Sequence, residues 1–394
     1  AALLLIVVGL LFFLPGFFNI PPVDRDEARF AQATKQMVEN GDFVDIRFQD
    51  EVRYKKPVGI YWAQAAVVES ASKLGLQRAQ VRIWLYRVPS LIGAIGAVLL
   101  TYWTALAFVT RRGALLAGLL MCSSILLGVE ARLAKTDAML LLTTTAVMGA
   151  MARAYLSWQR GDDNPHPSWK LAFVFWTAMA GGILLKGPLI LMFVALTVVT
   201  LAILDRSAAW LWRLRPVWGL MWTLVLVLPW FILIFLKAGD TFFADSLGSD
   251  MLNKVASAQE SHGAPPGLYF LLFWVTFWPG ATLAGLAVPA VWRARREPGA
   301  QFLLAWLLPA WIIFELVITK LPHYVLPLYP AIGILIIGAL ERRVLSQGSW
   351  IVRGTSWWFV LPLIMSVASI IGAIMLLKQP MIERSEEHTS ELQS

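Results

Sequence analysis

The chain of 394 residues is 58% hydrophobic and only 15% charged, and its mean hydropathy is +0.66. These values exclude a soluble globular protein, which needs more polar surface, and they indicate a polytopic membrane protein. The net charge of +8 does not indicate nucleic acid binding, because the basic residues are spread among loops and form no single stripe. The single cysteine, Cys122, lies in an apolar run and excludes a disulfide framework.

Apolar runs long enough to cross a bilayer recur along most of the chain. We therefore expect an all-α polytopic membrane protein with about eleven transmembrane helices. A large first outer loop, residues 19–87, separates the first two spans and is expected to carry surface helices and the catalytic motif. A second outer loop covers residues 237–266. The spans are expected near residues 3–18, 88–109, 113–129, 137–155, 170–185, 188–204, 216–236, 267–291, 301–318, 323–340 and 352–377.

Residues 1–383 are expected to form one transmembrane domain. The composition changes abruptly at residue 384, and the final stretch, RSEEHTSELQS, resembles the translation of a sequencing adapter. Residues 384–394 are therefore excluded from the fold analysis, and the native C-terminal region is expected to be missing.

The short loops alternate between a set rich in cations and a set poor in them. By the positive-inside rule, the poorer set faces away from the cytoplasm, and the first loop lies on that outer side. The richer set holds Arg111, Arg112, Arg153, Arg160, Lys170, Arg206, Arg213, Arg215, Arg293, Arg295, Arg296, Arg342 and Arg343. The poorer set holds Arg132, Lys135, Lys186, Lys237, Lys254 and Lys320.

The polar stretch from residue 24 to residue 57 is the first place to look for chemistry. Asp24 is expected to cap a helix over residues 25–39, which the Asn-Gly pair at residues 40 and 41 would end. Apolar residues on one side of this helix predict that it lies along the membrane surface. Asp26 and Arg29 share a face three residues apart, so the arginine can orient a carboxylate that acts as a general base. The alternative is that Asp26 only complements the charge of the helix N-terminus.

Three lysines on the expected outer face each stand just before a proline that can open a helix. They are Lys56, Lys186 and Lys320. A helix N-terminus offers free N–H donors and partial positive charge, and a neighbouring ammonium adds a full charge. The pattern predicts binding of a phosphate-bearing substrate, and the alternative is that these lysines only mark the membrane boundary.

Motifs across most of the chain resemble the membrane glycosyltransferases that use polyprenyl-phosphate sugars. These include the lipid A aminoarabinose transferases and the protein O-mannosyltransferases of the GT-C superfamily. The matches in chain order are DEARFA at 26–31, GDF at 41–43, KP at 56–57, TDA at 136–138, LKGP at 185–188, FWP at 277–279 and KLPHYVLP at 320–327.

The resemblance implies roles for individual residues. Asp26 resembles the catalytic aspartate that activates the acceptor, and Asp137 resembles the second acidic residue of the site. Lys56 resembles the lysine that binds the donor phosphate, and we expect Arg29, Lys186 and Lys320 to bind that phosphate too. The residues expected to contact substrate are Glu27, His262, His323 and Tyr324.

One position departs from the family pattern. Lys55 stands where the family has a glutamate that serves as a metal ligand, and an ammonium cannot bind zinc as a carboxylate does. We therefore predict no metal ligand at Lys55. His262, which resembles a histidine of the metal site in the aminoarabinose enzymes, then becomes a substrate contact. The sequence requires no cofactor and leaves dependence on a divalent metal open.

The sequence as a whole predicts an integral membrane hexosyl- or pentosyltransferase of the bacterial inner membrane, with its active site facing the periplasm. Its partners would be a polyprenyl-phosphate sugar donor, membrane lipids, and lipid A, another glycan or a protein as acceptor. The alternatives are a lipid or solute transporter and a non-catalytic sensor or assembly subunit. The absence of an internal sequence repeat and the gathering of charged residues at one membrane face favour the enzyme over the transporter.

Overall fold

The computed structural model describes residues 1–54, 56–161, 169–239 and 263–350, together with residues 352–358, 360, 364, 367 and 371. The chain divides into two compact units, residues Ala1–Leu345 and Ser346–Ser394. In the second unit, the described residues 352–358 are helical. The tail at 384–394, most of the span expected at 352–377 and most of the second outer loop lie outside the described residues.

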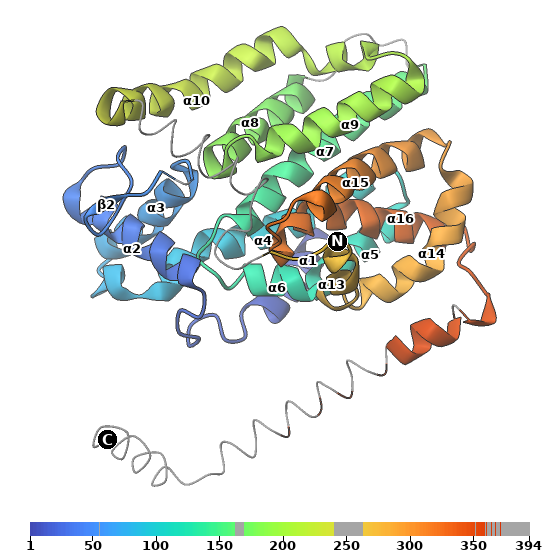
Figure 1. Ribbon diagram of the computed structural model, residues 1–394, viewed down its shortest axis with the longest axis horizontal. Coiled ribbons are helices and arrows are strands. Elements are labelled where there is room, and N and C mark those ends of the chain that lie inside the picture. Colours follow the sequence, from blue (N-terminus) through green and yellow to red (C-terminus); the bar gives the residue numbers. More distant parts are fainter. Residues whose placement is uncertain are drawn as a thin grey trace. The chain divides into compact units, whose positions relative to one another are not determined.

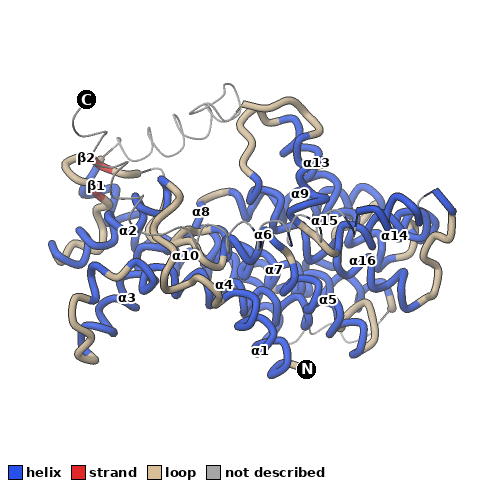
Figure 2. Tube along the Cα trace, turned by 90° about the horizontal axis from the view of Figure 1, so that it is seen from below, coloured by secondary structure: helices blue, strands red, loops and turns tan. Residues whose placement is uncertain are grey.

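The first unit is built almost entirely from helices, as the sequence predicts. Figure 1 shows α2, α3 and the β1–β2 hairpin gathered at one end of this unit, with α14 and α16 toward the other end, and Figure 2 agrees. The elements are α1 (Ala2–Phe13), α2 (Arg25–Asn40), β1 (Arg47–Phe48), β2 (Glu51–Val52), α3 (Gly59–Lys73), η1 (Ala79–Val81), α4 (Ile83–Ala105), α5 (Arg111–Ser123), α6 (Ile125–Glu130), α7 (Asp137–Gln159), α8 (Trp169–Lys186), α9 (Leu189–Asp205), η2 (Ala209–Leu214), α10 (Pro216–Ala238), α13 (Leu268–Thr276), α14 (Gly280–Ala294), α15 (Pro298–Leu316), η4 (Pro322–Leu328) and α16 (Tyr329–Glu341).

Helix α7 is the central helix of the first unit. Its most apolar window is 83% buried, whereas that of α10 is only 28% buried and presents large apolar side chains at its surface. Helices α4 and α8 pack directly against α7. At Gly93 of α4, a Cβ atom would lie 2.8 Å from the backbone carbonyl carbon of Ala138, so only glycine allows α4 to approach the first turn of α7 this closely.

The number of membrane spans differs from the sequence-based expectation of about eleven, which is not confirmed. Within the described residues, six helical segments are long and apolar enough to cross a bilayer. A seventh span results if α13 and α14, which meet at a bend of 119°, count as one. The six segments are α4, α7, α8, α10, α15 and the continuous stretch Pro322–Glu341.

The discrepancy arises where an apolar run contains a helix break. The run expected at 113–129 is divided at Ser124, whose extended backbone ends α5 and caps α6. The run expected at 267–291 is divided before Pro279, which cannot donate a backbone hydrogen bond to continue α13. Two other runs form the shorter apolar helices Ala2–Phe13 and Leu189–Asp205. Hydropathy counts apolar residues and does not register these breaks.

The helix expected at residues 25–39 of the first outer loop is confirmed as α2, but its apolar side packs on α3 where we expected it to face the membrane surface. The Asp24 side chain accepts a hydrogen bond of 2.7 Å from the backbone N–H of Asp26, and thereby caps the helix. Gly41 ends the helix with a positive φ of 65°, which an L side chain rarely adopts. The apolar side of α2, including Phe30, Ala33 and Met37, is buried. Against this side lies Tyr61 of α3, so α2 is held on the bundle by the face that its periodicity predicts.

Candidate active site

Buried ion pairs connect the cap of α2 to the loop that leads into α7. Lys135 lies between two carboxylates, with its Nζ atom 3.0 Å from Asp24 Oδ2 and 3.2 Å from Glu130 Oε1. Burial raises the pKa of the Asp24 carboxyl, but Lys135 and the backbone N–H of Asp26 outweigh burial and hold this pKa below its usual range. Burial lowers the pKa of Lys135, but Glu130, Asp137 and Asp24 outweigh it, so that pKa is raised. Both groups of the Asp24–Lys135 pair are therefore charged at neutral pH.

Further charged residues extend these ion pairs to Asp137, the first residue of α7. Asp137 accepts a hydrogen bond from Lys186, the last residue of α8. His323 lies between the two acidic residues: its Nδ1 atom is 3.6 Å from Glu130 Oε1 and its Nε2 atom is 3.7 Å from Asp137 Oδ1. We call the set Asp24, Glu130, Lys135, Asp137, Lys186 and His323 the charge network. It brings together the ends of helices that are far apart in the sequence.

Lys56 adds a further cation beside the charge network. It precedes α3, and its ammonium lies close enough to Lys186 for the two like charges to repel each other. Lys186 also lies over the ring of Tyr324, with its Nζ atom 5.4 Å from the ring centroid. Two neighbouring ammonium groups beside a helix N-terminus form a suitable binding place for a phosphate.

Asp26 occupies a more open position on α2 than the buried network. Its side chain is 49% exposed, with Arg29 Nη1 at 3.6 Å from Oδ1 and Arg53 Nη2 at 3.8 Å. The predicted partnership of Asp26 and Arg29 is thus present, and Arg53 joins it. An accessible carboxylate flanked by two arginines can meet a substrate while its charge is stabilised.

Glu27, by contrast, points away from solvent and is completely buried against Arg87 of α4. Glu27 Oε1 accepts hydrogen bonds from Arg87 Nε at 2.7 Å and from the backbone N–H of Ala134 at 3.1 Å, while Oε2 accepts one from Arg87 Nη2 at 3.1 Å. The remaining guanidinium N–H groups donate to the carbonyls of Phe17, Ile20 and Pro21. The pair therefore fixes α2 to α4 and to the loop before Asp137, and this placement gives Glu27 a positioning role where the sequence predicted substrate contact.

The other predicted residues fall into three groups. His323 and Tyr324 lie at the charge network, as described. Lys320 does not join it by any described contact, because its ammonium donates to the carbonyl of Val317 and its side chain is buried. His262 and Lys55 lie outside the described residues, so the predictions for them stay predictions.

Sequence analysis missed Glu130 as a site residue and treated Lys135 only as a loop cation. Glu130 stands at the end of an apolar run, and a carboxylate at such a position is a signal for function, since an unpaired charge there is costly. Asp24 was expected as a helix cap, which it is, but its second partner, Lys135, is 111 positions away in sequence. Local patterns do not predict a partner at that separation.

Glu130, Asp137 and His323 are a candidate metal site, because one possible ligand atom from each lies within 4.8 Å of the other two. Lys135 and Lys186 each bind one of the two carboxylates, so a metal ion would have to displace both ammonium groups. The second oxygen of Glu130 is buried without a hydrogen-bond partner, and a single such oxygen does not make a coordination sphere. The three residues fit an ion-pair network better than a metal site.

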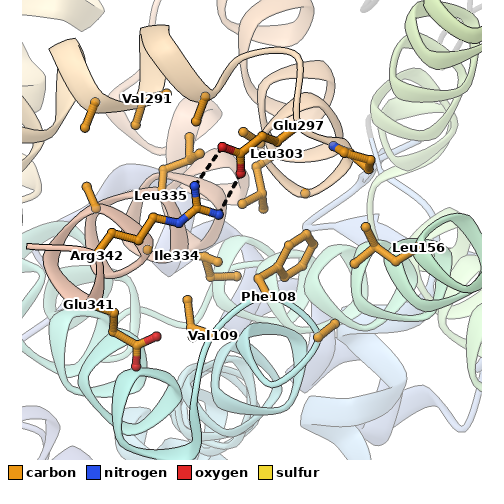
Figure 3. Close-up of a pocket in the computed structure, with 18 of the residues that line it drawn as sticks. Phe108, Val109, Leu156, Val291, Glu297, Leu303, Ile334, Leu335, Glu341 and Arg342 are labelled. Carbon is orange, nitrogen blue, oxygen red and sulfur yellow. Dashed lines mark hydrogen bonds and ion pairs between the residues drawn. The ribbon is translucent and has the colours of Figure 1, made fainter. Parts of the chain in front are cut away.

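A cavity lies at the other ends of these helices. It has a volume of about 360 Å³ and is lined by the C-terminal parts of α7, α14 and α16. Figure 3 shows apolar side chains such as Phe108 and Ile334 around it, with Glu297 and Arg342 paired across one side. None of the residues of the charge network lines this cavity, so it is separate from the candidate active site.

Known proteins resemble this chain over most of its length. Residues 3–240 match the family described as dolichyl-phosphate-mannose-protein mannosyltransferase. An undecaprenyl phosphate-alpha-4-amino-4-deoxy-L-arabinose arabinosyl transferase of Aeromonas salmonicida is 27% identical over 334 residues, which are 83% of this chain and 57% of that protein. The corresponding protein of Pseudomonas paraeruginosa is 26% identical over 90% of this chain and 62% of its own length. The chain thus spans less than two thirds of the length of these relatives.

Solved structures show the same fold. ArnT from Cupriavidus metallidurans bound to undecaprenyl phosphate superposes with a TM-score of 0.75 at 22% identity, over 96% of this chain and 65% of that one. The archaeal oligosaccharyltransferase AglB from Archaeoglobus fulgidus has a TM-score of 0.52 at 12% identity, over 94% of this chain and 54% of that one. The family match covers more than half of the chain and the fold agrees, so the chain belongs to the dolichyl-phosphate-mannose-protein mannosyltransferase family.

Proposed function

We propose that the chain is a membrane glycosyltransferase that transfers a sugar from a polyprenyl-phosphate donor to an acceptor of the cell envelope. The observation that carries the proposal is that Lys186 donates to the buried carboxylate of Asp137 while Lys56 comes from the segment before α3 that packs on the end of α8, next to Lys186. The curated relatives named above are transferases for a sugar carried on undecaprenyl phosphate. Transporters bind their substrates at broken helices near the middle of the bilayer, whereas these charged residues lie together at helix ends. The arrangement therefore favours the transferase over the transporter.

The donor phosphate would bind at Lys56 and Lys186. As the glycosidic bond breaks, the bond's electron pair stays on the phosphate oxygen, and the added negative charge is stabilised by the two cations. Asp26 accepts the proton of the attacking acceptor hydroxyl, and Arg29 and Arg53 hold its carboxylate in place. Asp137 keeps Lys186 oriented toward the phosphate. In this scheme the sugar lies between α2 and the start of α7.

We further propose that the site faces the periplasm from a bacterial inner membrane and that the acceptor is lipid A, a similar glycolipid or glycan, or a protein. The charge asymmetry of the loops supports this orientation. The names of the relatives support a sugar carried on undecaprenyl phosphate. Their chains extend well beyond this one, so the sugar and the acceptor must be determined by experiment.

The proposal is tested by transfer of radiolabelled sugar from a panel of polyprenyl-phosphate sugars to membrane acceptors. Vesicles that contain the parent protein are expected to transfer label, and Asp26→Asn is expected to reduce the rate by about 10²–10⁴, the usual contribution of a general base. Asp50→Asn is the matched control, because Asp50 is an exposed carboxylate of the same outer segment. Parent vesicles that transfer no label from any donor to intact acceptor membranes would contradict the proposal.

Transfer is also expected to survive metal removal. The two lysines that neutralise Glu130 and Asp137 perform the electrostatic task that a divalent ion would otherwise perform. Vesicles washed with EDTA should therefore transfer label at the rate of untreated vesicles, and addition of Mg²⁺, Mn²⁺ or Zn²⁺ should not raise that rate. A loss with EDTA that one of these ions restores would show that the enzyme needs a metal.

A further inference from the structure

A second groove lies on the side of the helix bundle opposite the candidate active site. It has a volume of about 540 Å³ and is formed where α4, α7 and α8 meet. Two cations and four apolar residues line it: Arg153, Lys170, Leu100, Trp103, Leu171 and Val174. No Asp or Glu of the described chain belongs to this lining. The groove therefore combines an apolar surface with positive charge that its own walls do not neutralise.

The two cations lie at the same depth in the membrane. Arg153 follows Asp137 by sixteen positions along α7, and Lys170 precedes Lys186 by sixteen positions along α8. Asp137 and Lys186 are bonded to each other, so the two helices run in opposite directions from a common level. A rise of 1.5 Å per residue places both cations about 24 Å below that level. This depth is close to the far surface of a hydrocarbon core of about 30 Å.

Arg153 is held rigidly beside the groove. Its guanidinium lies 3.7 Å from the ring centroid of Trp103, and it donates to the carbonyl of Gly149 at 2.9 Å and to the carbonyl of Trp103. Lys170 is exposed at the start of α8, and within the described part of the chain no carboxylate forms an ion pair with either cation. An arginine held in place and an exposed lysine that line the same groove can bind one anion together.

We propose that this groove binds an anionic glycerophospholipid of the leaflet opposite the candidate active site. The phosphate of the headgroup lies between Arg153 and Lys170, and an acyl chain lies along Leu100, Leu171 and Val174. Basic pockets between transmembrane helices bind anionic headgroups in this way. The polyprenyl-phosphate donor is a different case, because its phosphate is needed at Lys56 and Lys186, on the other side of the bilayer.

The test is native mass spectrometry of the full chain in detergent, titrated with phosphatidylglycerol and, separately, with phosphatidylcholine that carries the same acyl chains. The parent is expected to retain one phosphatidylglycerol per chain and to bind phosphatidylcholine more weakly. Lys170→Gln is expected to weaken binding of phosphatidylglycerol about fivefold, the effect of one cation near a membrane surface, and Lys170→Glu should weaken it further. Because Lys170 is exposed, neither variant removes a buried contact.

Arg112→Gln is the matched control, since Arg112 is an exposed cation at the first turn of α5 and lies outside the groove. It should bind phosphatidylglycerol as the parent does. Equal weakening in Arg112→Gln and Lys170→Gln would indicate only a general attraction of basic residues for the membrane surface and would overturn the proposal. Equal affinity for phosphatidylcholine would do the same. Displacement of the bound lipid by polyprenyl phosphate, with the same sensitivity to Lys170→Gln, would assign the groove to the donor.

Discussion

Replacement of Arg87 by alanine is expected to lower the free energy of unfolding by about 3–5 kcal/mol, because it leaves Glu27 as an uncompensated buried charge. Both side chains are 0% exposed, and the Arg87 guanidinium donates to Glu27 and to three backbone carbonyls. Unfolding of the purified protein in detergent, followed by tryptophan fluorescence against denaturant concentration, measures the loss.

Two variants make this prediction specific. Arg82→Ala removes an exposed arginine at the N-terminus of the same helix, whose side chain does not cap the helix and donates to the carbonyl of Gln77, and its effect should stay within about 0.5 kcal/mol. The double variant Glu27→Leu with Arg87→Leu removes both charges and should be more stable than Arg87→Ala. If Arg87→Ala and Arg82→Ala prove equally stable, the buried pair does not hold α2 in place.

Replacement of Lys56 by glutamine is expected to reduce the turnover number of sugar transfer by about 10²–10³, the effect of removing one group that stabilises charge in a transition state. Lys56 is the better of the two lysines to change, because Lys186 also balances the buried Asp137. The loss should fall mainly on kcat, since the phosphate, which already carries one negative charge in the donor, gains a second as the glycosidic bond breaks. Initial rates over a range of donor concentrations separate kcat from KM.

Lys73→Gln is the control for this experiment. Lys73 lies on α3, the helix that follows Lys56, but its side chain is 80% exposed and forms an ion pair with Glu69 of the same helix. This variant should keep the kcat and KM of the parent. A Lys56→Gln enzyme that shows the parent's kcat and a raised KM would mean that Lys56 binds the donor without stabilising the departing phosphate.

Helix α2 could be predicted from the sequence because the signals that define it are local. Asp24 caps its first turn, Gly41 ends it, and the apolar positions between them recur with helical spacing. The order of apolar and polar segments also predicted the all-α membrane fold. The breaks at Ser124 and before Pro279 were not predicted, since hydropathy counts the apolar residues on both sides and does not register a capping serine or a proline within the run.

The candidate site could be predicted only in part. Asp137, Lys186 and His323 stand at the ends of apolar runs on the expected outer side, and the structure brings all three together. Lys320 satisfies the same sequence pattern, yet it turns toward its own backbone. The pattern places a lysine at a helix end but does not fix the direction of its side chain. Glu130 and Lys135 acquire their roles from partners in other segments, which sequence spacing does not reveal.

The residues of the charge network are synthesised in a fixed order, so their ion pairs cannot all form at the same time. Its members come from four separate stretches of the chain, namely Asp24, residues 130–137, Lys186 and His323, and the last of them, His323, is synthesised long after Asp24 and Glu130. When α7 first inserts, Asp137 has no Lys186 to neutralise it, and Glu27 cannot accept from Ala134 until the chain has passed residue 134. Early helices therefore enter the bilayer with unbalanced charges at their outer ends. The ion pairs are complete only once α8 has supplied Lys186, and η4 then places the ring of His323 between Glu130 and Asp137.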